Sequence, residues 1–291
     1  MSFCFFPSLG LVCTRLLPSP WLNSSNSNCN GLLKWQDLYS RSEAHPYSYK
    51  ITTYGISSFN EWHASSIRPN PHGGSDYILC HKGYPLANIS LKMPGIHNVL
   101  NSLAVIVTMM ALFTNQKQIS ELINCARLHL SSFIGVSRRF EMVGTVRGCH
   151  IYDDYAHHPT EVHAVLQAAR QRFPKEALVV VFQPHTYSRL AALKNDFARA
   201  LSKADDVMIS AVYPAREVNT WNINGRDLAA SIVGTKAEYI PNLEDVVDML
   251  VLKILEAPDH DTVVLTLGAG DISTVGTRLL HELRQRLQNV L

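Results

Sequence analysis

Residues 177–189 read Ala-Leu-Val-Val-Val-Phe-Gln-Pro-His-Thr-Tyr-Ser-Arg, and this stretch decides the fold class of the second half of the chain. Its first half has the unbroken hydrophobicity that is typical of a parallel strand buried on both faces. Residues 262–267 repeat that pattern. Both runs alternate with amphipathic segments at helical spacing. The sequence therefore predicts an α/β domain over residues 137–291, open and doubly wound, with a mostly parallel sheet.

The predicted order of elements follows from the same alternation. Strands are expected at residues 150–152, 177–183, 206–212, 237–240 and 262–267. Helices are expected at residues 160–172, 189–204, 225–233, 243–255 and 273–287. Ligands of open α/β sheets bind beyond the carboxyl ends of the strands.

Polar loops at residues 153–158, 183–189 and 268–272 each follow one of these strands, so they are expected at one edge of the sheet. In the first loop, Pro159 fits the first position of a helix. His157 and His158 would then lie at a helix N-terminus, which favours an anion such as phosphate. A capped helix with a solvated polar loop is the alternative interpretation.

Other polar side chains also have two interpretations. Arg189 is either a fork that binds a carboxylate or phosphate, or a solvated residue at a helix start. Asn98 and Asn101 share a helix face and can read an adenine edge, or they are an N-cap and a buried polar residue. Arg138 and Arg139 are either surface charge or phosphate ligands at a domain interface.

The front of the chain divides into two parts. The first 36 residues contain no Asp or Glu and are rich in Ser and Asn, as in an organelle transit peptide. A secretory signal or a non-native start are alternatives, and residues 1–45 are expected to be transit-like or disordered. Residues 46–136 predict strands at 49–54, 76–80 and 84–91, helices at 98–113 and 118–131, and a linker at 133–139.

Composition excludes several classes of protein. A formal charge of +2 without a basic stripe argues against a nucleic-acid partner. No apolar run reaches the length of a membrane span, and residues 99–113 predict a buried helix. The six cysteines form no C-x-x-C pair, which argues against a disulfide framework or zinc site, so we expect no metal ligands among them and a reducing compartment.

Five blocks of sequence resemble the Mur ligase family. They are G-I-H-N-V-L-N at 95–101, R-R-F-E at 138–141, D-D-Y-A-H-H-P-T-E at 153–161, F-Q-P-H-T-Y-S-R at 182–189 and G-A-G-D-I at 268–272. The resemblance implies a C-terminal family domain at 137–291, preceded by the tail of the central, ATPase-type α/β domain at 46–136. A murein-recycling branch shares the H-H-P loop and remains an alternative.

The resemblance also implies a reaction. Family members use ATP and Mg²⁺ to activate a carboxylate, here that of UDP-N-acetylmuramate, as an acyl phosphate. The amine of an amino acid, here L-alanine, then displaces phosphate and forms an amide. The implied partners are therefore small molecules, namely the UDP-sugar, the amino acid and ATP.

Residue roles in the nucleotide site are carried over from the same blocks. Asn98 and Asn101 would contact adenine. Arg139 would approach the ATP phosphates, and Asp154 would contact the ribose.

The remaining roles carried over concern the reacting end of the site. Tyr155 and His157 would line the nucleotide site near the phosphates. Arg189 would hold the carboxylate of the amino acid. His185 lies in the matching loop, and the resemblance gives it a place in the substrate site without a firm role.

The chain also departs from the family pattern. The phosphate loop G-x-x-G-K-[ST] is absent, since no Gly-Lys pair occurs in the sequence. The phosphate-clamping Lys, the Ser/Thr that holds Mg²⁺ and the metal-binding Glu therefore have no counterpart. We expect either a truncated ligase, inactive alone, or a non-catalytic module for nucleotide or protein binding. Either a partner or an oligomer could supply the missing domains, in the cytoplasm or, with a transit peptide, in a plastid.

Overall fold

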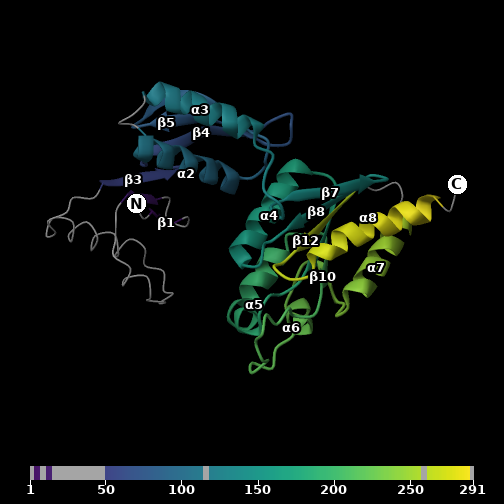
Figure 1. The fold of residues 1–291 in the computed structure, drawn as a ribbon. Coiled ribbons are helices and arrows are strands. Elements are labelled where there is room, and N and C mark those ends of the chain that lie inside the picture. The colour runs from purple at the N-terminus through teal and green to yellow at the C-terminus, as the bar shows by residue number, and fades with distance from the viewer. Residues whose placement is uncertain (1–2, 7–10, 15–49, 114–117, 257–260, 289–291) are drawn as a thin grey trace. The chain divides into compact units, whose positions relative to one another are not determined.

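The chain divides into two compact units, Met1–Phe133 and Ile134–Leu291 (Figure 1). The computed structural model describes residues 3–6, 11–14, 50–113, 118–256 and 261–288. The division lies three residues before the domain boundary expected after residue 136. The interpretation of residues 1–45 as transit-like or disordered falls outside the described residues, apart from two short strands.

Six strands form one sheet within the described part of the second unit, in the order β11-β10-β9-β12-β8-β7. The strands are β7 (Glu141–Val146), β8 (Cys149–Asp154), β9 (Ala177–Phe182), β10 (Asp206–Ile209), β11 (Lys236–Tyr239) and β12 (Thr262–Leu267). All neighbours pair in parallel except β7, which is antiparallel to β8. The predicted α/β class with a mostly parallel sheet is confirmed.

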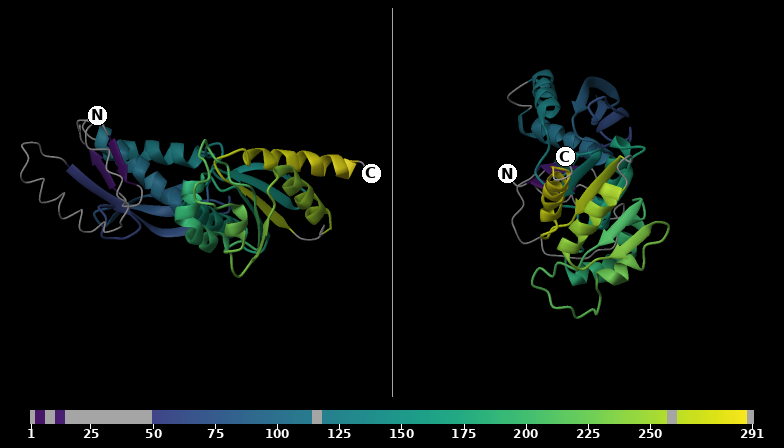
Figure 2. Two further views of the ribbon diagram at one scale, coloured as in Figure 1. Left: turned by 90° about the horizontal axis from the view of Figure 1, so that it is seen from below. Right: turned by 90° about the vertical axis from the view of Figure 1, so that its right-hand side faces the viewer.

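Helices cover both faces of this sheet. They are α4 (Pro159–Arg172), α5 (Tyr187–Leu201), α6 (Gly225–Ala229), α7 (Leu243–Glu256) and α8 (Ser273–Gln288). One buried cluster joins α4, α5 and α6 to the sheet, and a second joins α7 and α8 to its other face. Both views in Figure 2 show the yellow α8 running beside α7.

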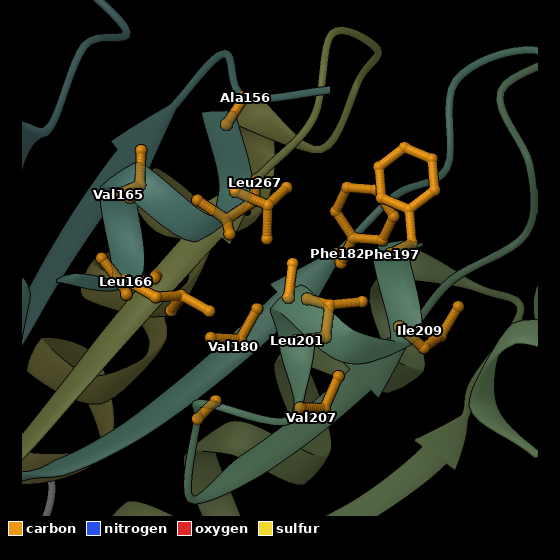
Figure 3. Packing of buried hydrophobic residues seen from close by; sticks show 14 of the residues in the cluster. Ala156, Val165, Leu166, Val180, Phe182, Phe197, Leu201, Val207, Ile209 and Leu267 are labelled. Carbon is orange, nitrogen blue, oxygen red and sulfur yellow. The ribbon is translucent and has the colours of Figure 1, made fainter. Parts of the chain in front are cut away.

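Alternation along β9 explains the two clusters. Val180 and Phe182 pack in the cluster with α4 and α5, as Figure 3 shows. Val179 and Val181 point to the opposite face and pack with α7 and α8. Because successive side chains of a strand alternate between faces, a strand covered on both sides must be apolar throughout. The Val-Val-Val run of the sequence reflects this demand.

Several elements of the second unit differ from the prediction. Strand β7 was not expected, because it is an edge strand with Met142 half-exposed and Gly144 in its middle. Strand β10 ends at Ile209 rather than at residue 212, and helix α5 ends at Leu201 rather than at residue 204. Helix α6 ends at Ala229 rather than at residue 233.

The first unit contains a second sheet, in the order β1-β2-β3-β4-β5-β6 among the described residues. Its strands are β1 (Phe3–Phe6), β2 (Leu11–Thr14), β3 (Lys50–Gly55), β4 (Trp62–Pro69), β5 (Ser75–His81) and β6 (Tyr84–Leu91). Only β3 and β4 pair in parallel. The predicted hairpin around Lys82 is confirmed as β5 and β6. Strand β4 lies in a stretch for which no strand was predicted from the sequence.

Helices α2 (Ile96–Phe113) and α3 (Ile119–Ser132) complete the first unit. By length and composition, α2 is the one helix in the described chain that is apolar enough to cross a membrane. Its side chains Val99, Leu103 and Ile106 are fully buried against the sheet of its own unit. The apolar composition of α2 therefore matches the buried core helix that the sequence predicts.

Candidate active site at the carboxyl edge of the second sheet

The three predicted polar loops meet at one edge of the second sheet. They follow β8, β12 and β9, which are neighbours in that order. The amide of Gln183 donates from its Nε2 to Asp271 Oδ1 at 2.7 Å, and its Oε1 accepts from the backbone N–H of Ile272 at 3.2 Å. The loop after β9 is thus bound to the loop after β12, and the convergence expected from the sequence is confirmed.

Two glycines in the third loop allow neighbouring loops to pack closely against it. Gly268 has a φ of +145°, and a Cβ there would come within 2.8 Å of the Gln183 carbonyl oxygen. A Cβ on Gly270 would collide with the Gln183 amide and with the ring of Tyr213. The space beside both glycines is therefore taken by neighbouring loops.

Arg138 joins two of these loops from the linker side. Its Nε donates to Asp153 Oδ2 at 2.8 Å, and its Nη2 donates to the carbonyl oxygen of Gly268 at 2.6 Å. The hydroxyl of Thr266 donates to the other Asp153 oxygen at 2.7 Å. Both oxygens of this buried carboxylate are therefore satisfied inside the protein. Sequence reasoning left Arg138 as surface charge or a phosphate ligand, and nothing in its spacing marked it as a clamp.

Asp154 is buried next to this clamp. Its Oδ2 accepts the backbone N–H of Phe140, and its Oδ1 accepts that of Ala156, both at 2.8 Å. Burial raises the pKa of Asp154 to about 6, although these two hydrogen bonds oppose the shift. Each carboxylate oxygen can accept a second hydrogen bond. A ribose hydroxyl that binds Asp154 would therefore have to share a carboxylate oxygen that already accepts a backbone N–H group.

The Tyr155 ring lies close to two cations. The guanidinium groups of Arg138 and Arg139 lie 5.1 and 5.6 Å from the centre of its ring, which suits cation–π attraction. Arg139 is half-exposed, with Nη1 3.5 Å from Glu161 and 3.9 Å from Asp154. The exposed guanidinium of Arg139 is available to an anion, in keeping with the phosphate role that the resemblance implies.

The N-terminus of α4 is capped by the protein itself. Pro159 occupies the start of α4, as predicted, and His158 is its N-cap. Glu161 Oε2 accepts the backbone N–H groups of His157 and His158, each at 3.1 Å. A side-chain carboxylate thus stands where the sequence had suggested a phosphate. Glu161 stands three residues after the N-cap, as in a capping box, but His158 is not one of the residues that mark an N-cap in a sequence.

His157 turns its ring toward the second loop. Its Nδ1 lies 3.0 Å from the carbonyl oxygen of Tyr155 and 3.4 Å from Glu161 Oε2. Its ring centre lies 5.9 Å from that of His185. Two histidines from different loops therefore face the same small space.

His185 lies on the loop after β9, and Arg189 lies in the first turn of α5, which follows that loop. Arg189 Nη1 is 3.2 Å from His185 Nδ1 and 3.4 Å from the His185 carbonyl oxygen. The His185 ring also stacks on Tyr213, with ring centres 5.6 Å apart. The structure therefore brings together the two residues that the resemblance assigned to the amino-acid site, with His157 beside them.

Glu217 belongs to this cluster, and sequence reasoning missed it. It accepts the backbone N–H of Ser188 at 2.9 Å and the Ser188 hydroxyl at 2.5 Å. The hydroxyl bond first, and then the N–H bond, hold the pKa of Glu217 below its usual range. No sequence signal links Glu217 to Ser188, because the contact spans 29 residues.

Asn98 and Asn101 belong to the first unit. Both lie in the first turns of α2, and the Asn98 amide donates from Nδ2 to the Pro94 carbonyl oxygen at 2.7 Å. Its Oδ1 remains an acceptor, and Asn101 is exposed. Both residues therefore lie in the first unit, whereas the loop cluster belongs to the second.

Comparison with known proteins gives this architecture a family context. Residues 138–270 match a family model described as Mur ligase, glutamate ligase domain. A curated UDP-N-acetylmuramate–L-alanine ligase of Caldanaerobacter subterraneus is 36% identical over 80% of this chain and 48% of its own length. The protein of that name from Agathobacter rectalis is 38% identical over 80% of this chain and 49% of its own length. The chain spans about half the length of the curated relatives it matches.

Solved structures agree with these matches. The UDP-N-acetylmuramate–alanine ligase of Thermotoga maritima superposes with a TM-score of 0.64 and 28% identity, over 81% of this chain and 48% of that one. A murein peptide ligase from Psychrobacter arcticus superposes with a TM-score of 0.53 over 79% of this chain and 45% of that one. Its identity of 23% supports a shared fold alone.

Proposed function

This chain belongs to the Mur ligase family, and we propose that it carries the amino-acid-binding part of an ATP-dependent ligase. The proposed reaction joins L-alanine to the carboxylate of UDP-N-acetylmuramate. One observation carries the proposal: Arg189, His185 and His157 converge at the carboxyl edge of the sheet. A guanidinium and two imidazoles suit recognition of an amino acid, which has a carboxylate and an ammonium group.

L-Alanine is favoured as the amino acid by the comparisons. Relatives that carry the alanine-ligase name match at 35–39% identity, and a solved structure of that name matches at 28%. We therefore prefer the alanine ligase to the murein-recycling alternative.

ATP would activate the carboxylate of UDP-N-acetylmuramate as an acyl phosphate. The residues of this chain fit the nucleoside side of such a site, because Asn98 keeps an amide oxygen and Asn101 is exposed. Arg139 offers an exposed guanidinium to a phosphate. The residues of this chain do not fit the part of the site that would bind the phosphates and Mg²⁺, because the sequence contains no Gly-Lys pair. We propose no step that runs through that side of the site.

A non-catalytic nucleotide- or protein-binding module is the second candidate. The 5′ end of the native transcript separates the two candidates. An upstream exon that encodes a glycine-rich loop with Gly-Lys-Thr supports the ligase, and a transcript that begins at Met1 supports the module.

We propose the cytoplasm as the compartment. Cys80, Cys125 and Cys149 are free thiols, which fits a reducing environment. The plastid alternative depends on residues 1–45, most of which lie outside the described part of the chain.

The proposed function is tested in a chimera. Residues 50–291 are joined behind the N-terminal half of the Thermotoga maritima ligase and assayed for phosphate release with UDP-N-acetylmuramate, L-alanine, ATP and Mg²⁺. We expect L-alanine-dependent release from the chimera and none from the 291-residue chain alone. Release by the chain alone, well above that of an Asp154→Ala, His157→Ala double variant, would show that the phosphate loop is dispensable.

Arg189 is the residue whose replacement tests the amino-acid site in the chimera. Arg189→Ala should raise the KM for L-alanine about ten- to a hundredfold, because one charged hydrogen bond to the carboxylate contributes roughly 1.5–3 kcal/mol. The KM for ATP should change little. Arg189→Lys should restore binding only in part, because an ammonium cannot form the bidentate pair. An unchanged KM for L-alanine would make Arg189 a surface residue of α5.

A further inference from the structure

Strand β11 forms one edge of the second sheet. Among the described strands it pairs with β10 alone, in parallel. The backbone N–H of Ile240, directly after β11, donates to the carbonyl oxygen of Ile209 at 2.8 Å and therefore points toward β10. Because successive N–H groups of a strand point to opposite sides, those of Ala237 and Tyr239 point outward. The outer edge of β11 thus presents backbone groups that a further strand can pair with.

The side chains of this edge carry opposite charges on one face. Lys236 and Glu238 are two residues apart, so they point to the same side of the sheet. Their charged groups lie 2.5 Å apart, and the side chains are 64% and 35% exposed. No proline occurs at residues 234–239, so no outward N–H is missing from this edge. The charge pattern Lys-Ala-Glu is complementary to itself when a second copy runs in the opposite direction.

We propose that β11 pairs with β11 of a second copy of this chain, antiparallel, about a two-fold axis at Ala237. The outward N–H and C=O groups of the two Ala237 residues then bond to each other across the axis. Lys236 lies directly opposite Glu238 of the second copy, and the same contact recurs on the other side of the axis, as an isologous interface requires. These charged residues form non-hydrogen-bonded pairs, in which the side chains of opposite residues lie closest.

The charges also select the register of this pairing. An axis at Lys236 would place two lysines opposite each other, and an axis at Glu238 would do the same with two glutamates. Both of those axes would also direct the inward N–H groups, which face β10, into the interface. An axis at Tyr239 would use outward groups, but it would place Glu238 opposite the apolar Ile240. The axis at Ala237 satisfies the backbone and both charges together.

A hollow beside β11 provides apolar surface for the opposing side chains. It measures about 440 Å³, and its lining includes Met208 of β10, Lys236, and Met249 and Leu252 of α7. Met249 and Leu252 are large apolar side chains that are exposed at the surface of α7. The carbon stem of a charged residue opposite Lys236 can pack on such side chains while its charged end stays in water. Burial of apolar surface in this hollow would therefore add to the charge pairs.

The oligomeric state of the full 291-residue chain, measured by analytical ultracentrifugation over a range of concentrations, tests the proposal. We expect a reversible equilibrium between monomer and dimer. Lys236→Glu should raise the dissociation constant about tenfold or more, because both cross-strand pairs change from attraction to repulsion. Lys175→Glu is the matched control, since it makes the same charge change at an exposed lysine between α4 and β9 and should leave the dimer unchanged. A native chain that stays monomeric throughout would overturn the proposal.

Exchange of the charges separates pairing across the axis from a general effect of charge. Glu238→Lys should weaken the dimer as Lys236→Glu does. An equimolar mixture of these two variants should form dimers, because the edge of one copy then carries two acidic residues and the other two basic residues. The double variant Lys236→Glu, Glu238→Lys should also dimerise, since it keeps opposite charges in each pair. Failure of the mixture or of the double variant to recover the dimer would contradict the assigned register, and recovery excludes misfolding as the cause of the loss.

Amide hydrogen exchange, resolved by NMR, tests the backbone contacts of the same interface. The outward amide of Ala237 should exchange more slowly as the concentration of the native chain rises. The amides of Glu238 and Ile240 should not change, because they face β10 in the monomer. In Lys236→Glu the exchange of Ala237 should lose its dependence on concentration. Exchange of Ala237 that is the same at every concentration, or a dimer that persists unweakened in Lys236→Glu, would place the interface on another surface and overturn the proposal.

Discussion

Arg138 shows how one side chain can hold a site that it does not enter. It links the buried Asp153 carboxylate to the loop after β12 through the Gly268 carbonyl. The backbone of Arg138 itself has a φ of +58°, a conformation that persists only where surrounding contacts enforce it. The ion pair with Asp153 and the strained turn therefore support each other.

Replacement of Arg138 should destabilise the second unit. In Arg138→Ala the Asp153 carboxylate stays buried without its cation, which costs about 3 kcal/mol in a buried pair. The neighbouring Arg139→Ala should cost less than about 1 kcal/mol, because its ion pairs are half-exposed. Amide hydrogen exchange of β8 and β12, followed by mass spectrometry, measures both. Equal exchange in the two variants would contradict the role of Arg138 as a clamp.

Asp154 should make the second unit more stable in mild acid. Burial raises its pKa from 3.8 to about 6 in the folded chain. The folded state therefore binds a proton in a range where the unfolded state does not, and stability falls as pH rises from about 4 to 7. The rise in pKa corresponds to about 3 kcal/mol at neutral pH.

Asp154→Asn provides the measurement, since it does not titrate and keeps an oxygen acceptor for the Ala156 N–H. Urea unfolding of both proteins is compared between pH 5 and pH 7.5, so that the histidines contribute equally. The native chain should gain stability relative to Asp154→Asn as the pH falls. Parallel curves would show that the carboxyl of Asp154 has an ordinary pKa.

At the scale of elements, a carboxylate from the first turn of α4 caps the N-terminus of that helix. Glu161 closes the first turn through two backbone N–H groups and also contacts the ring of His157. Glu161→Ala should therefore cost about 1 kcal/mol of stability and free the His157 ring to turn. Glu161→Gln should retain the cap, because Gln also serves at this position. Hydrogen exchange at the His157 and His158 amides reports the cap, and faster exchange in the Gln variant than in the Ala variant would contradict it.

The strands and helices could be predicted where periodicity is strong. The Val-Val-Val run of β9 must be apolar on both faces, and such a pattern is visible in the sequence. The edge strand β7 could not be predicted, because Met142 is exposed and Gly144 packs against Leu280 of a distant helix. Burial on one face only, by a residue far along the chain, leaves no local pattern.

The candidate site shows the same limit at a larger scale. The position of the three loops follows from strand order, so residues such as Arg189 could be found by their place after a buried strand. The capping of Ser188 by Glu217 and the clamp of Arg138 on Gly268 depend on contacts across 29 and 130 residues. Spacing in a sequence does not encode such contacts, and these residues emerge only from the fold.

At the scale of the whole molecule, the division of the chain predicts how a protease will cut it. The second unit has its own sheet and two buried clusters, and its first strand begins at Glu141. Between α3 and β7, the side chains of Ile134 and Val136 are 83% and 60% exposed. Backbone that is exposed and free of regular structure is the preferred site of cleavage.

Limited digestion should therefore cut at residues 133–137 and leave a stable fragment that ends at Leu291. Mass spectrometry identifies the fragment, and hydrogen exchange of its β9 and β12 amides should match that of the intact chain, because both strands are covered within the second unit. Rapid loss of the fragment, or faster exchange in those strands, would show that the second unit depends on the first for its stability.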